Sequence, residues 1–361
     1  MKKILLLCLT LFLLAGCNGQ SSVRSASDAA ESAAQISAGE LQVHYIDVGQ
    51  GDATLLQYAD QSSTYRILLD AGNINSDNLI PYLKAQQVDY LDVAIGTHPD
   101  ADHIGQLAKV LQTFSVGEIW LSGNTSTSDT FQELLHVISE TEIEYAEPRR
   151  GNIFDIGPME IEVLSPKNIS GQSNEESLAF RFTYGDIHLL FTGDAPVEME
   201  QEMIEEQQPL AATILHLGHH GSSTSTSPAF LEAVDPEMAI YSAGKNNTYG
   251  HPHQEVVDLV KSKGIPLYGT DTDGTIVVES DGISYHIHTT NQQACSGIDL
   301  NRASLEELQE IVHIGEARAA ELISLRPFHS LNELKKISGI GERNILDIKE
   351  QGTACVDSEG E

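Results

Sequence analysis

The sequence predicts an α/β domain over residues 40–290 and a small all-α domain over residues 296–352. In the first region, short apolar runs typical of strands alternate with helix-like stretches and glycine-rich turns, a pattern typical of sheets covered by helices. In the second region the strand-like runs stop, and one helical pattern occurs twice in succession. The chain has 361 residues, 40% of them hydrophobic, which is enough to bury more than one core.

The composition excludes one class of DNA-binding protein. The chain has 53 Asp and Glu residues against 20 Lys and Arg residues, a formal net charge of −33. Because this charge repels polyanions at long range, the protein does not gather DNA through a diffuse basic surface. Twelve of its 14 histidines lie between His44 and His288, which suggests a metal site.

The N-terminus has the pattern of an export signal. Lys2 and Lys3 precede an apolar run from Ile4 to Leu14 that is too short for a permanent membrane span. The residues Leu14–Cys17 resemble the lipobox of bacterial lipoproteins. We therefore expect a signal peptide over residues 1–16, a lipid on Cys17, and an extracytoplasmic protein anchored to the membrane by that lipid. The alternative is an ordinary secretory peptide with an incidental cysteine.

Two composition-based expectations follow for the rest of the chain. Residues 17–39 hold the lipidated cysteine and a polar stretch without aromatic residues, which is typical of a flexible linker. Without Cys8 and Cys17, only Cys295 and Cys355 remain, in a compartment that permits disulfides. A disulfide between them would close a loop of about 60 residues and contribute roughly 4 kcal/mol in the chain-entropy model. The alternative is two unpaired thiols.

The elements of the α/β domain follow from apolar periodicity. The predicted strands are Leu41–Val48, Ala53–Tyr58, Tyr65–Leu69, Tyr90–Ile95, Ile161–Leu164, Leu178–Tyr184 and Ile187–Phe191. The predicted helices are Asn78–Gln86, Ile104–Gln112, Phe131–Ser139, Val197–Glu206, Pro228–Ala233 and Gln254–Lys263.

The all-α domain reads as two short helical hairpins in tandem. Capping-box patterns open helices at Ser304–Glu307 and again at Ser330–Glu333. In each copy, Ile311–Gly315 or Ile337–Gly341 ends one apolar stretch and begins the next.

A cluster of metal-binding side chains follows the buried strand that ends at Thr97. The run His98–His103 holds two histidines and two carboxylates in six residues. His98 and Asp100 can point to one side while Asp102 and His103 serve a second position. This arrangement is the one that a two-metal hydrolytic centre needs, with ligands for each of two ions.

This run resembles the metallo-β-lactamase superfamily signature His-x-His-x-Asp-His, with Asp100 in place of the second histidine, as in ComEC-type competence proteins. The resemblance extends over nearly all of residues 40–290 and implies an αββα sandwich with a metal-dependent hydrolase activity. Five further segments match the same subfamily: Tyr45–Ala53, Leu68–Gly72, Phe191–Asp194, His219–Ser222 and Gly244–Pro252.

The resemblance also implies roles for individual residues. Asp194 bridges two metals, Asp102 and His103 bind one ion together with His219 or His220, and His98 and Asp100 hold the other. Asp102 and Asp194 are the expected catalytic residues. Four residues are expected around this set: Asp70 orients the ligands, Asp52 approaches the metals more closely than Asp47 does, and Lys245 and His251 lie near a substrate phosphate.

The sequence departs from the superfamily in its third histidine motif. The interval before Asp194 holds only His136, in a helix-like stretch, and His188, in a strand, while Asn174–Ser177 resembles the subfamily's Asn-x-x-Ser. We expect one or two divalent ions, Mn²⁺ or Zn²⁺, with the extra carboxylate favouring the harder ion. The alternatives are a structural polar network or an inactive site. Five other histidines are expected to be ordinary surface or strand residues: His44, His216, His253, His286 and His288.

The C-terminal hairpins resemble the paired helix-hairpin-helix module of ComEA-type DNA receptors. There, glycines allow tight turns, so that N–H groups at the next helix hold a phosphate without net positive charge. The DNA-binding residues expected here are Gly315, Gly339, Gly341 and Arg343. Residues 299–350 hold seven Lys or Arg against ten acids, and His313 stands where the family has a small residue. The alternative is a module that binds protein or packs on the hydrolase.

Together these features predict a cell-surface, metal-dependent phosphodiesterase or nuclease that acts on DNA, in DNA uptake or in the processing of extracellular DNA. DNA, the membrane and a DNA-uptake machinery are the expected partners. Two alternatives stay open: a hydrolase of another phosphoester or cell-wall substrate, and a non-catalytic DNA receptor.

Overall fold

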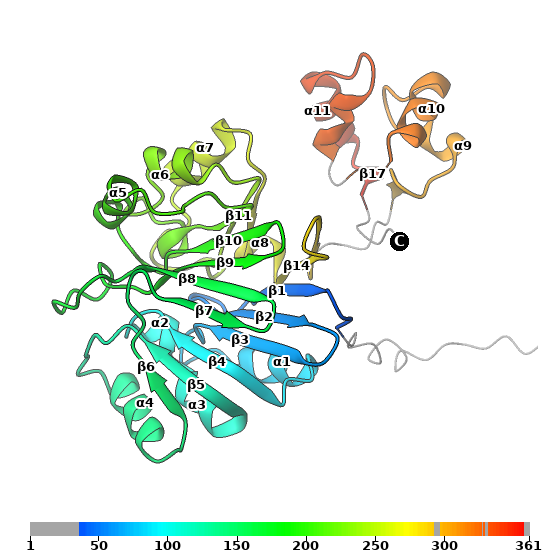
Figure 1. The fold of residues 1–361 in the computed structure, drawn as a ribbon. Helices are drawn as coiled ribbons and strands as arrows, with labels where there is room; N and C mark the ends of the chain where they lie inside the picture. The colour runs from blue at the N-terminus through cyan, green and yellow to red at the C-terminus, as the bar shows by residue number, and fades with distance from the viewer. Residues whose placement is uncertain (1–35, 292–296, 327, 329–330, 357–361) are drawn as a thin grey trace, which may run out of the picture. The chain divides into compact units, whose positions relative to one another are not determined.

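A computed structural model describes residues 36–291, 297–326, 328 and 331–356. The predicted signal peptide, the lipidation site Cys17, most of the linker and Cys295 lie outside the described residues. The larger domain is an αββα sandwich: two sheets pack face to face, and helices cover their outer faces (Figure 1). This confirms the predicted fold class.

The first sheet has the strand order β15-β14-β1-β2-β3-β4-β5-β6. Strands β3 to β6 are parallel to one another, and the remaining pairs are antiparallel. Its outer face is covered by α1 (Leu79–Ala85), α3 (Leu107–Thr113) and α4 (Asp129–Ser139). Its strands are β1 (Leu41–Tyr45), β2 (Thr54–Ala59), β3 (Thr64–Leu69), β4 (Tyr90–Gly96), β5 (Ser115–Leu121), β6 (Glu144–Ala146), β14 (Ile276–Ser280) and β15 (Tyr285–Thr289).

The second sheet has the strand order β13-β12-β11-β10-β9-β8-β7, with β10 to β13 parallel. Helices α5 (Val197–Glu205), α6 (Pro228–Val234) and α7 (Gln254–Ser262) cover its outer face, and the short α8 (Thr270–Asp273) follows β13. Its strands are β7 (Ile153–Ile156), β8 (Met159–Ser165), β9 (Ala179–Tyr184), β10 (Ile187–Phe191), β11 (Ile214–His216), β12 (Met238–Tyr241) and β13 (Leu267–Gly269).

Strands buried on both faces explain the continuous apolar runs in the sequence. All six residues of β2 are buried: Leu56 faces the core between the two sheets, and its neighbour Leu55 faces the helical layer. Trp120 lies in the core between the sheets, with its ring 4.5 Å from Phe154 and 6.2 Å from Phe180. A strand with both faces covered has no solvent side, and so it needs no polar alternation.

One predicted helix is wrong in its extent. Instead of a single helix from Ile104, the chain forms α2 (Ala101–Ile104), a break at Gly105 and Gln106, and then α3. A β-carbon on Gly105 would collide with the backbone of Gly72 and of Ile74. The glycine therefore lets α2 press against the loop that follows β3, and this close approach interrupts the helix.

The C-terminal module contains the two predicted hairpins around its own apolar core. Its elements are β16 (Ile298–Asp299), α9 (Leu305–Leu308), α10 (Glu316–Ser324), the 3₁₀ helix η3 (Leu331–Lys336), α11 (Glu342–Gln351) and β17 (Ala354–Cys355). The capping box of Ser304 and Glu307 is present, whereas Ser330 lies outside the described residues. Within the described ranges, no helix combines the length and the apolar character that crossing a membrane requires.

Candidate metal centre

The expected metal ligands come together at one edge of the sandwich. Parallel strands end at the same edge of a sheet, and here the loops after β3 and β4 of the first sheet meet the loops after β10 and β11 of the second. A backbone hydrogen bond from Leu178 N to Thr97 O, 2.9 Å long, links the two sheets at this edge. The loops carry Asp70, His98, Asp100, Asp102, His103, Asp194, His219 and His220.

Asp194 lies between two groups of side chains. Its Oδ1 is 3.2 Å from His103 Nε2, while its Oδ2 is 3.6 Å from His98 Nε2 and 3.4 Å from His219 Nε2. The side chain is buried. Its two oxygens therefore face different partners, as a bridging carboxylate requires.

The consecutive histidines His219 and His220 lie in different groups. His220 Nε2 is 3.3 Å from Asp102 Oδ2 and its ring is 5.1 Å from that of His103, so it belongs to the Oδ1 side of Asp194. His219 lies on the Oδ2 side with His98, whose Nε2 is 3.7 Å from Asp100 Oδ2.

The backbone of the 3₁₀ turn η2 (Gly218–Gly221) separates these two histidines. His219 and His220 have φ values of 52° and 56°, and a hydrogen bond from His219 N to Gly193 O (3.0 Å) holds the turn beside Asp194. A left-handed residue other than glycine costs of order 1–3 kcal/mol and tends to occur at functional sites. This conformation points two neighbouring rings in different directions, with an interplanar angle of 66°.

The donor atoms fit a divalent metal. Among the described residues, Nε2 of His98, His103 and His220 and Oδ1 of Asp194 are buried and have no well-oriented hydrogen bond, although they face one another or nearby carboxylates at 3.2 to 3.6 Å. Buried polar atoms are almost always satisfied, so this cluster of orphaned atoms points to an ion. Asp52, His103, Asp194 and His220 can each offer a ligand atom within 4.8 Å of the others.

The opposite side of each imidazole ring is held by the protein. Each of the four histidines uses Nδ1 for a protein partner, which leaves Nε2 for the centre. The partners are Thr97 Oγ1 for His98 (3.1 Å), Asp70 Oδ2 for His103 (2.8 Å), Thr224 Oγ1 for His219 (2.9 Å) and the Ser242 carbonyl for His220 (3.0 Å).

The charges of the centre are strongly coupled. Burial alone would raise the pKa of Asp194, but His103 and His98 outweigh it and hold that pKa well below its usual range. Burial likewise lowers the pKa of His103, yet Asp194 and Asp70 raise it well above 6.5. The pKa of His220 is raised to about 10, because Asp52 and Asp102 outweigh burial. Without metal, protons therefore occupy His103 and His220 at neutral pH, whereas burial and the neighbouring His103 lower the pKa of His98.

Asp70 and Asp52 lie behind the ligands. Asp70 directly follows β3 with a φ of 59° and accepts hydrogen bonds from Thr97 N, Thr97 Oγ1 and His103 Nδ1, all 2.8 Å long. Asp52 lies on the Nδ1 side of His103 and His220, at 3.9 and 3.6 Å. Asp47 instead accepts from Gly49 N (3.0 Å) and shapes the preceding loop.

Three contacts at the centre have no counterpart in the sequence prediction. His216 is a strand residue as expected, but its Nε2 lies 3.6 Å from Asp52 Oδ1 as well as 3.0 Å from Ser242 Oγ. Thr97 joins Asp70 to His98. Ser173 donates to Asp100 Oδ1 at 2.9 Å. Of these three contacts, only that of Thr97 had a signal in the sequence, namely a polar residue directly after a buried strand.

The other histidines behave largely as predicted. His44 lies in β1 and contacts Tyr82 and Gln57, while His286 and His288 lie in β15. His136 lies in α4 and His188 in β10. Ser177, the last residue of the Asn-x-x-Ser segment, accepts a hydrogen bond from Asp194 N at 3.3 Å.

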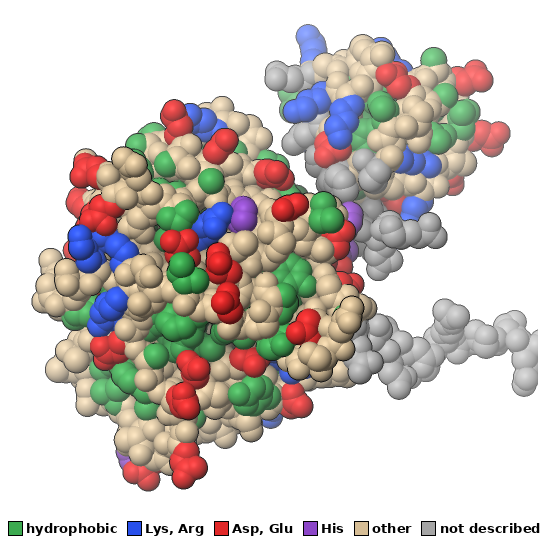
Figure 2. Space-filling view, in the orientation of Figure 1, with side chains coloured by type: hydrophobic (Ala, Val, Ile, Leu, Met, Phe, Trp, Pro, Cys, Tyr) green, Lys and Arg blue, Asp and Glu red, His purple; other side chains and the backbone are tan. Residues whose placement is uncertain are grey.

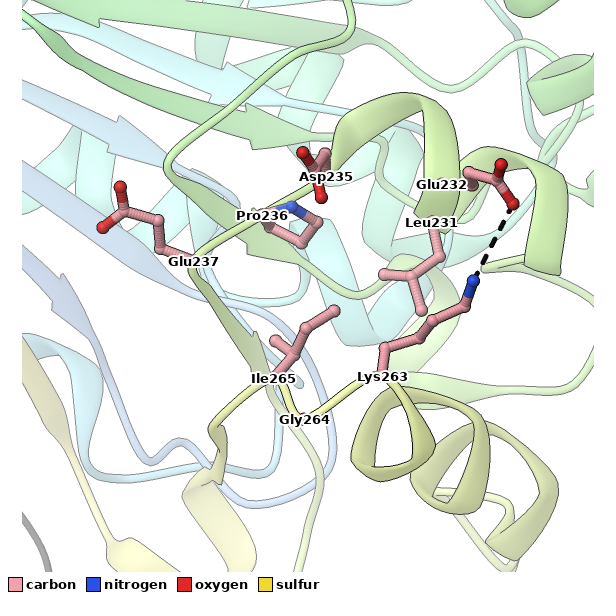
Figure 3. Close-up of a pocket in the computed structure, with 8 residues that line it drawn as sticks. All are labelled: Leu231, Glu232, Asp235, Pro236, Glu237, Lys263, Gly264 and Ile265. Carbon is pink, nitrogen blue, oxygen red and sulfur yellow. Dashed lines mark ion pairs between the residues drawn. The ribbon is translucent and has the colours of Figure 1, made fainter. Parts of the chain in front are cut away.

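The loop 244–252 borders the centre. The ring of His251 lies 5.5 Å from that of His219 and 5.9 Å from that of His220, and Lys245 is exposed on the same loop. Burial and the nearby histidines lower the pKa of His251 to about 4. A separate hollow of about 340 Å³ contains none of the predicted site residues (Figure 3). It is lined by Leu231, Glu232, Asp235, Pro236, Glu237, Lys263, Gly264 and Ile265.

Residues 46–245, which make up more than half of the chain, match the metallo-beta-lactamase superfamily. The chain belongs to the metallo-β-lactamase superfamily. Residues 293–351 match the helix-hairpin-helix motif. The resemblance noted in both parts of the sequence is thereby confirmed.

Curated relatives of this metallo-β-lactamase chain include competence proteins. It is 33% identical over 255 residues to ComE operon protein 3 of Bacillus subtilis. The matched region covers 66% of this chain and 33% of the relative. It is 32% identical over 243 residues to competence protein ComA of Neisseria gonorrhoeae, covering 66% and 32%. The chain thus spans about a third of the length of these relatives.

Two further matches are a deoxyribonuclease and a solved structure. A deoxyribonuclease of Thioalkalivibrio is 46% identical over 65 residues, 18% of each protein. The metallo-beta-lactamase fold protein YhfI from Bacillus subtilis has a TM-score of 0.46 at 15% identity, covering 67% of this chain and 99% of that one.

The helix-hairpin-helix module places its glycines at turns and helix starts. Gly315 and Gly341 are the N-caps of α10 and α11, and Gly339 has a φ of 76°. His313 takes the corresponding place in the first hairpin with a φ of 66°, and its Nε2 lies 2.7 Å from Asp347 Oδ2 of α11.

Arg318 ties the two hairpin turns together. It donates to the carbonyl oxygens of His313, Ser338 and Gly339 at 2.7 to 3.2 Å. Arg343 is exposed at the start of α11. In the view of Figure 2, acidic and basic side chains are both scattered over the larger domain and over the C-terminal module.

Proposed function

We propose that the chain is a metal-dependent phosphodiesterase that cleaves DNA outside the cytoplasmic membrane. The observation that carries this proposal is the position of Asp194, whose two oxygens face two separate groups of histidine and aspartate side chains. Centres that hold two ions in this way suit the hydrolysis of phosphate esters, because both the attacking and the leaving oxygen need positive charge nearby.

The distances around Asp194 support two ligand positions. One ion would be held by Asp102, His103 and His220, and the other by His98, Asp100 and His219, with Asp194 between them. Bound divalent ions supply a Lewis acid for the phosphoryl oxygens and lower the pKa of water. Mixed nitrogen and carboxylate donors suit Mn²⁺ or Zn²⁺.

The remaining residues orient this set. Asp70 fixes the ring and tautomer of His103, and Ser173 orients Asp100. His251 borders the centre and Lys245 is exposed on the same loop, which supports a role for both in contacting a substrate phosphate.

DNA is the proposed substrate because the catalytic domain is joined to a helix-hairpin-helix module. Relatives named as competence proteins and as a deoxyribonuclease support this choice. In the module, Gly315, Gly339, Gly341 and Arg343 are proposed to hold the phosphate backbone. The N-terminal pattern supports an anchor through a lipid on Cys17, and a disulfide between Cys295 and Cys355 would clip the module.

The test is cleavage of single- and double-stranded DNA by residues 18–361 with Mn²⁺ or Zn²⁺. We expect metal-dependent cleavage that Asp102→Ala abolishes and that the control Asp186→Ala, at an exposed turn between β9 and β10, leaves intact. Absence of cleavage, with Asp102→Ala equal to the parent, contradicts the proposal. Turnover of a generic phosphodiester without DNA cleavage would favour another phosphoester, and binding without cleavage would favour a DNA receptor.

A further inference from the structure

Tyr249 presents an exposed aromatic ring next to the candidate metal centre. It lies on the loop 244–252 and is 63% exposed. Its ring stacks on that of His251, with a centroid distance of 5.7 Å and an interplanar angle of 22°. The His251 ring in turn contacts those of His219 and His220. These three ring contacts connect Tyr249, through His251, to one histidine proposed for each ion.

The loop fixes the backbone that carries this ring before any substrate binds. The side-chain amide of Asn247 donates to the carbonyl oxygens of Gly244 and His251 at 2.9 and 2.5 Å. Its oxygen accepts from Tyr249 N and His251 N at 3.1 and 3.0 Å. All four hydrogen-bonding positions of this amide are therefore used within the loop. A ring that is already positioned loses little entropy when it binds a partner.

One face of the Tyr249 ring is open to a partner. The other face lies on His251, and the side chain is 63% exposed, so a second flat ring can stack on it without displacing any residue. Lys245 is exposed on the same loop. An aromatic ring that stacks on bases, combined with a cation that contacts the backbone, is the combination that binds single-stranded nucleic acid.

We propose that Tyr249 stacks on an unpaired base next to the phosphate that is cleaved, and that this makes single-stranded DNA or an unpaired DNA end the preferred substrate. This inference rests on the proposed function. In a duplex each base is stacked on its neighbours, so the ring can engage only a base that has left the stack.

The first test measures stacking itself, in an Asp102→Ala background that prevents cleavage. The probe is a short single-stranded oligonucleotide that contains 2-aminopurine, whose fluorescence falls when the base stacks. We expect quenching with Tyr249 and with Tyr249→Phe, loss of quenching with Tyr249→Ala, and binding weaker by roughly 5- to 150-fold. Tyr145→Ala, a tyrosine on β6 that is 46% exposed, is the matched control and should quench like the parent. Full quenching with Tyr249→Ala overturns the inference.

The second test separates this inference from the proposed function. In the metal-loaded full chain, Tyr249→Ala should raise KM for a single-stranded oligonucleotide by a similar factor and leave kcat nearly unchanged. On an oligonucleotide with abasic sites flanking the cleaved phosphate, parent and Tyr249→Ala should have the same KM. A parent that cleaves neither oligonucleotide contradicts the proposed function. A parent that cleaves both, with the same effect of Tyr249→Ala on each, contradicts only the role of Tyr249.

Discussion

Replacement of Asp70 by Asn is expected to weaken metal binding through the tautomer of His103. Asp70 Oδ1 accepts from Thr97 N, and its Oδ2 accepts from Thr97 Oγ1 and His103 Nδ1, each at 2.8 Å. The backbone N–H of Thr97 can only donate, so the new amide must direct its oxygen there and its NH₂ group toward His103. His103 would then accept at Nδ1 and carry its proton on Nε2, the atom that faces Asp194.

The size of this effect follows from the contacts that are lost. A hydrogen bond to a charged group contributes about 1.5–3 kcal/mol. Loss of a partner that supports a ligand histidine typically lowers metal affinity about 10- to 100-fold, or about 1.4–2.7 kcal/mol. The two figures agree, and the substitution hardly changes the side-chain volume. We therefore expect a loss of metal affinity of about 10- to 100-fold with the fold retained.

The assay is a competition titration of metal-free protein against a chelator dye, with circular dichroism to check the fold. Asp92→Asn is the matched control, because Asp92 is a partly buried carboxylate in β4 that accepts from Arg66 N at 2.7 Å. This variant should bind metal like the parent. Parent-like affinity in a folded Asp70→Asn variant would refute the tautomer argument.

Two further predictions concern protons and the C-terminal module. Metal loading should release protons, and apparent affinity should rise from pH 6 to about 10, because Asp52 and Asp102 outweigh burial and raise the pKa of His220 from 6.5 to about 10. The same shift stabilises the metal-free fold below pH 6.5, and this contribution is lost as the pH rises to about 10. Calorimetry at pH 7 in two buffers of different ionisation enthalpy checks this, and equal heats would contradict it. Gly339→Ala should weaken DNA binding measured by anisotropy, because a φ of 76° costs alanine about 1–2 kcal/mol and its β-carbon would lie 2.8 Å from Arg318 Nη2. Gly352→Ala, with a φ of 68° and no neighbour within 4 Å, should bind DNA normally; equal losses in both variants would argue against a role for the turn.

The fold was predictable where the physical cause is local. Strand β2 is apolar throughout because both of its faces are covered, and the capping box of Ser304 depends only on residues three apart. The break between α2 and α3 was not predictable, because it depends on the backbone of Gly72 and Ile74 approaching Gly105 from a distant loop. Strand β5 also gives a weak signal, since Gly117 and Glu118 interrupt its apolar run.

The candidate site divides in the same way. His98 to His103 are close in sequence, so their clustering needs only one strand end. Which of His219 and His220 faces which side of Asp194 depends on two left-handed residues in succession, a conformation that no side-chain pattern reveals. The contact of His216 with Asp52 and that of Ser173 with Asp100 arise only when distant loops meet.

The meeting of loops from both sheets has a thermodynamic consequence. Asp102 and His103 lie after β4 of the first sheet, whereas Asp194, His219 and His220 lie after β10 and β11 of the second, and each proposed ion takes ligands from both sides. Ions bound as proposed would therefore act as cross-links between the two halves of the sandwich. By linkage, the free energy of binding them is also free energy that opposes separation of the sheets. Under the proposed function, metal supply would govern how firmly this edge of the protein stays closed, in addition to whether it can perform chemistry.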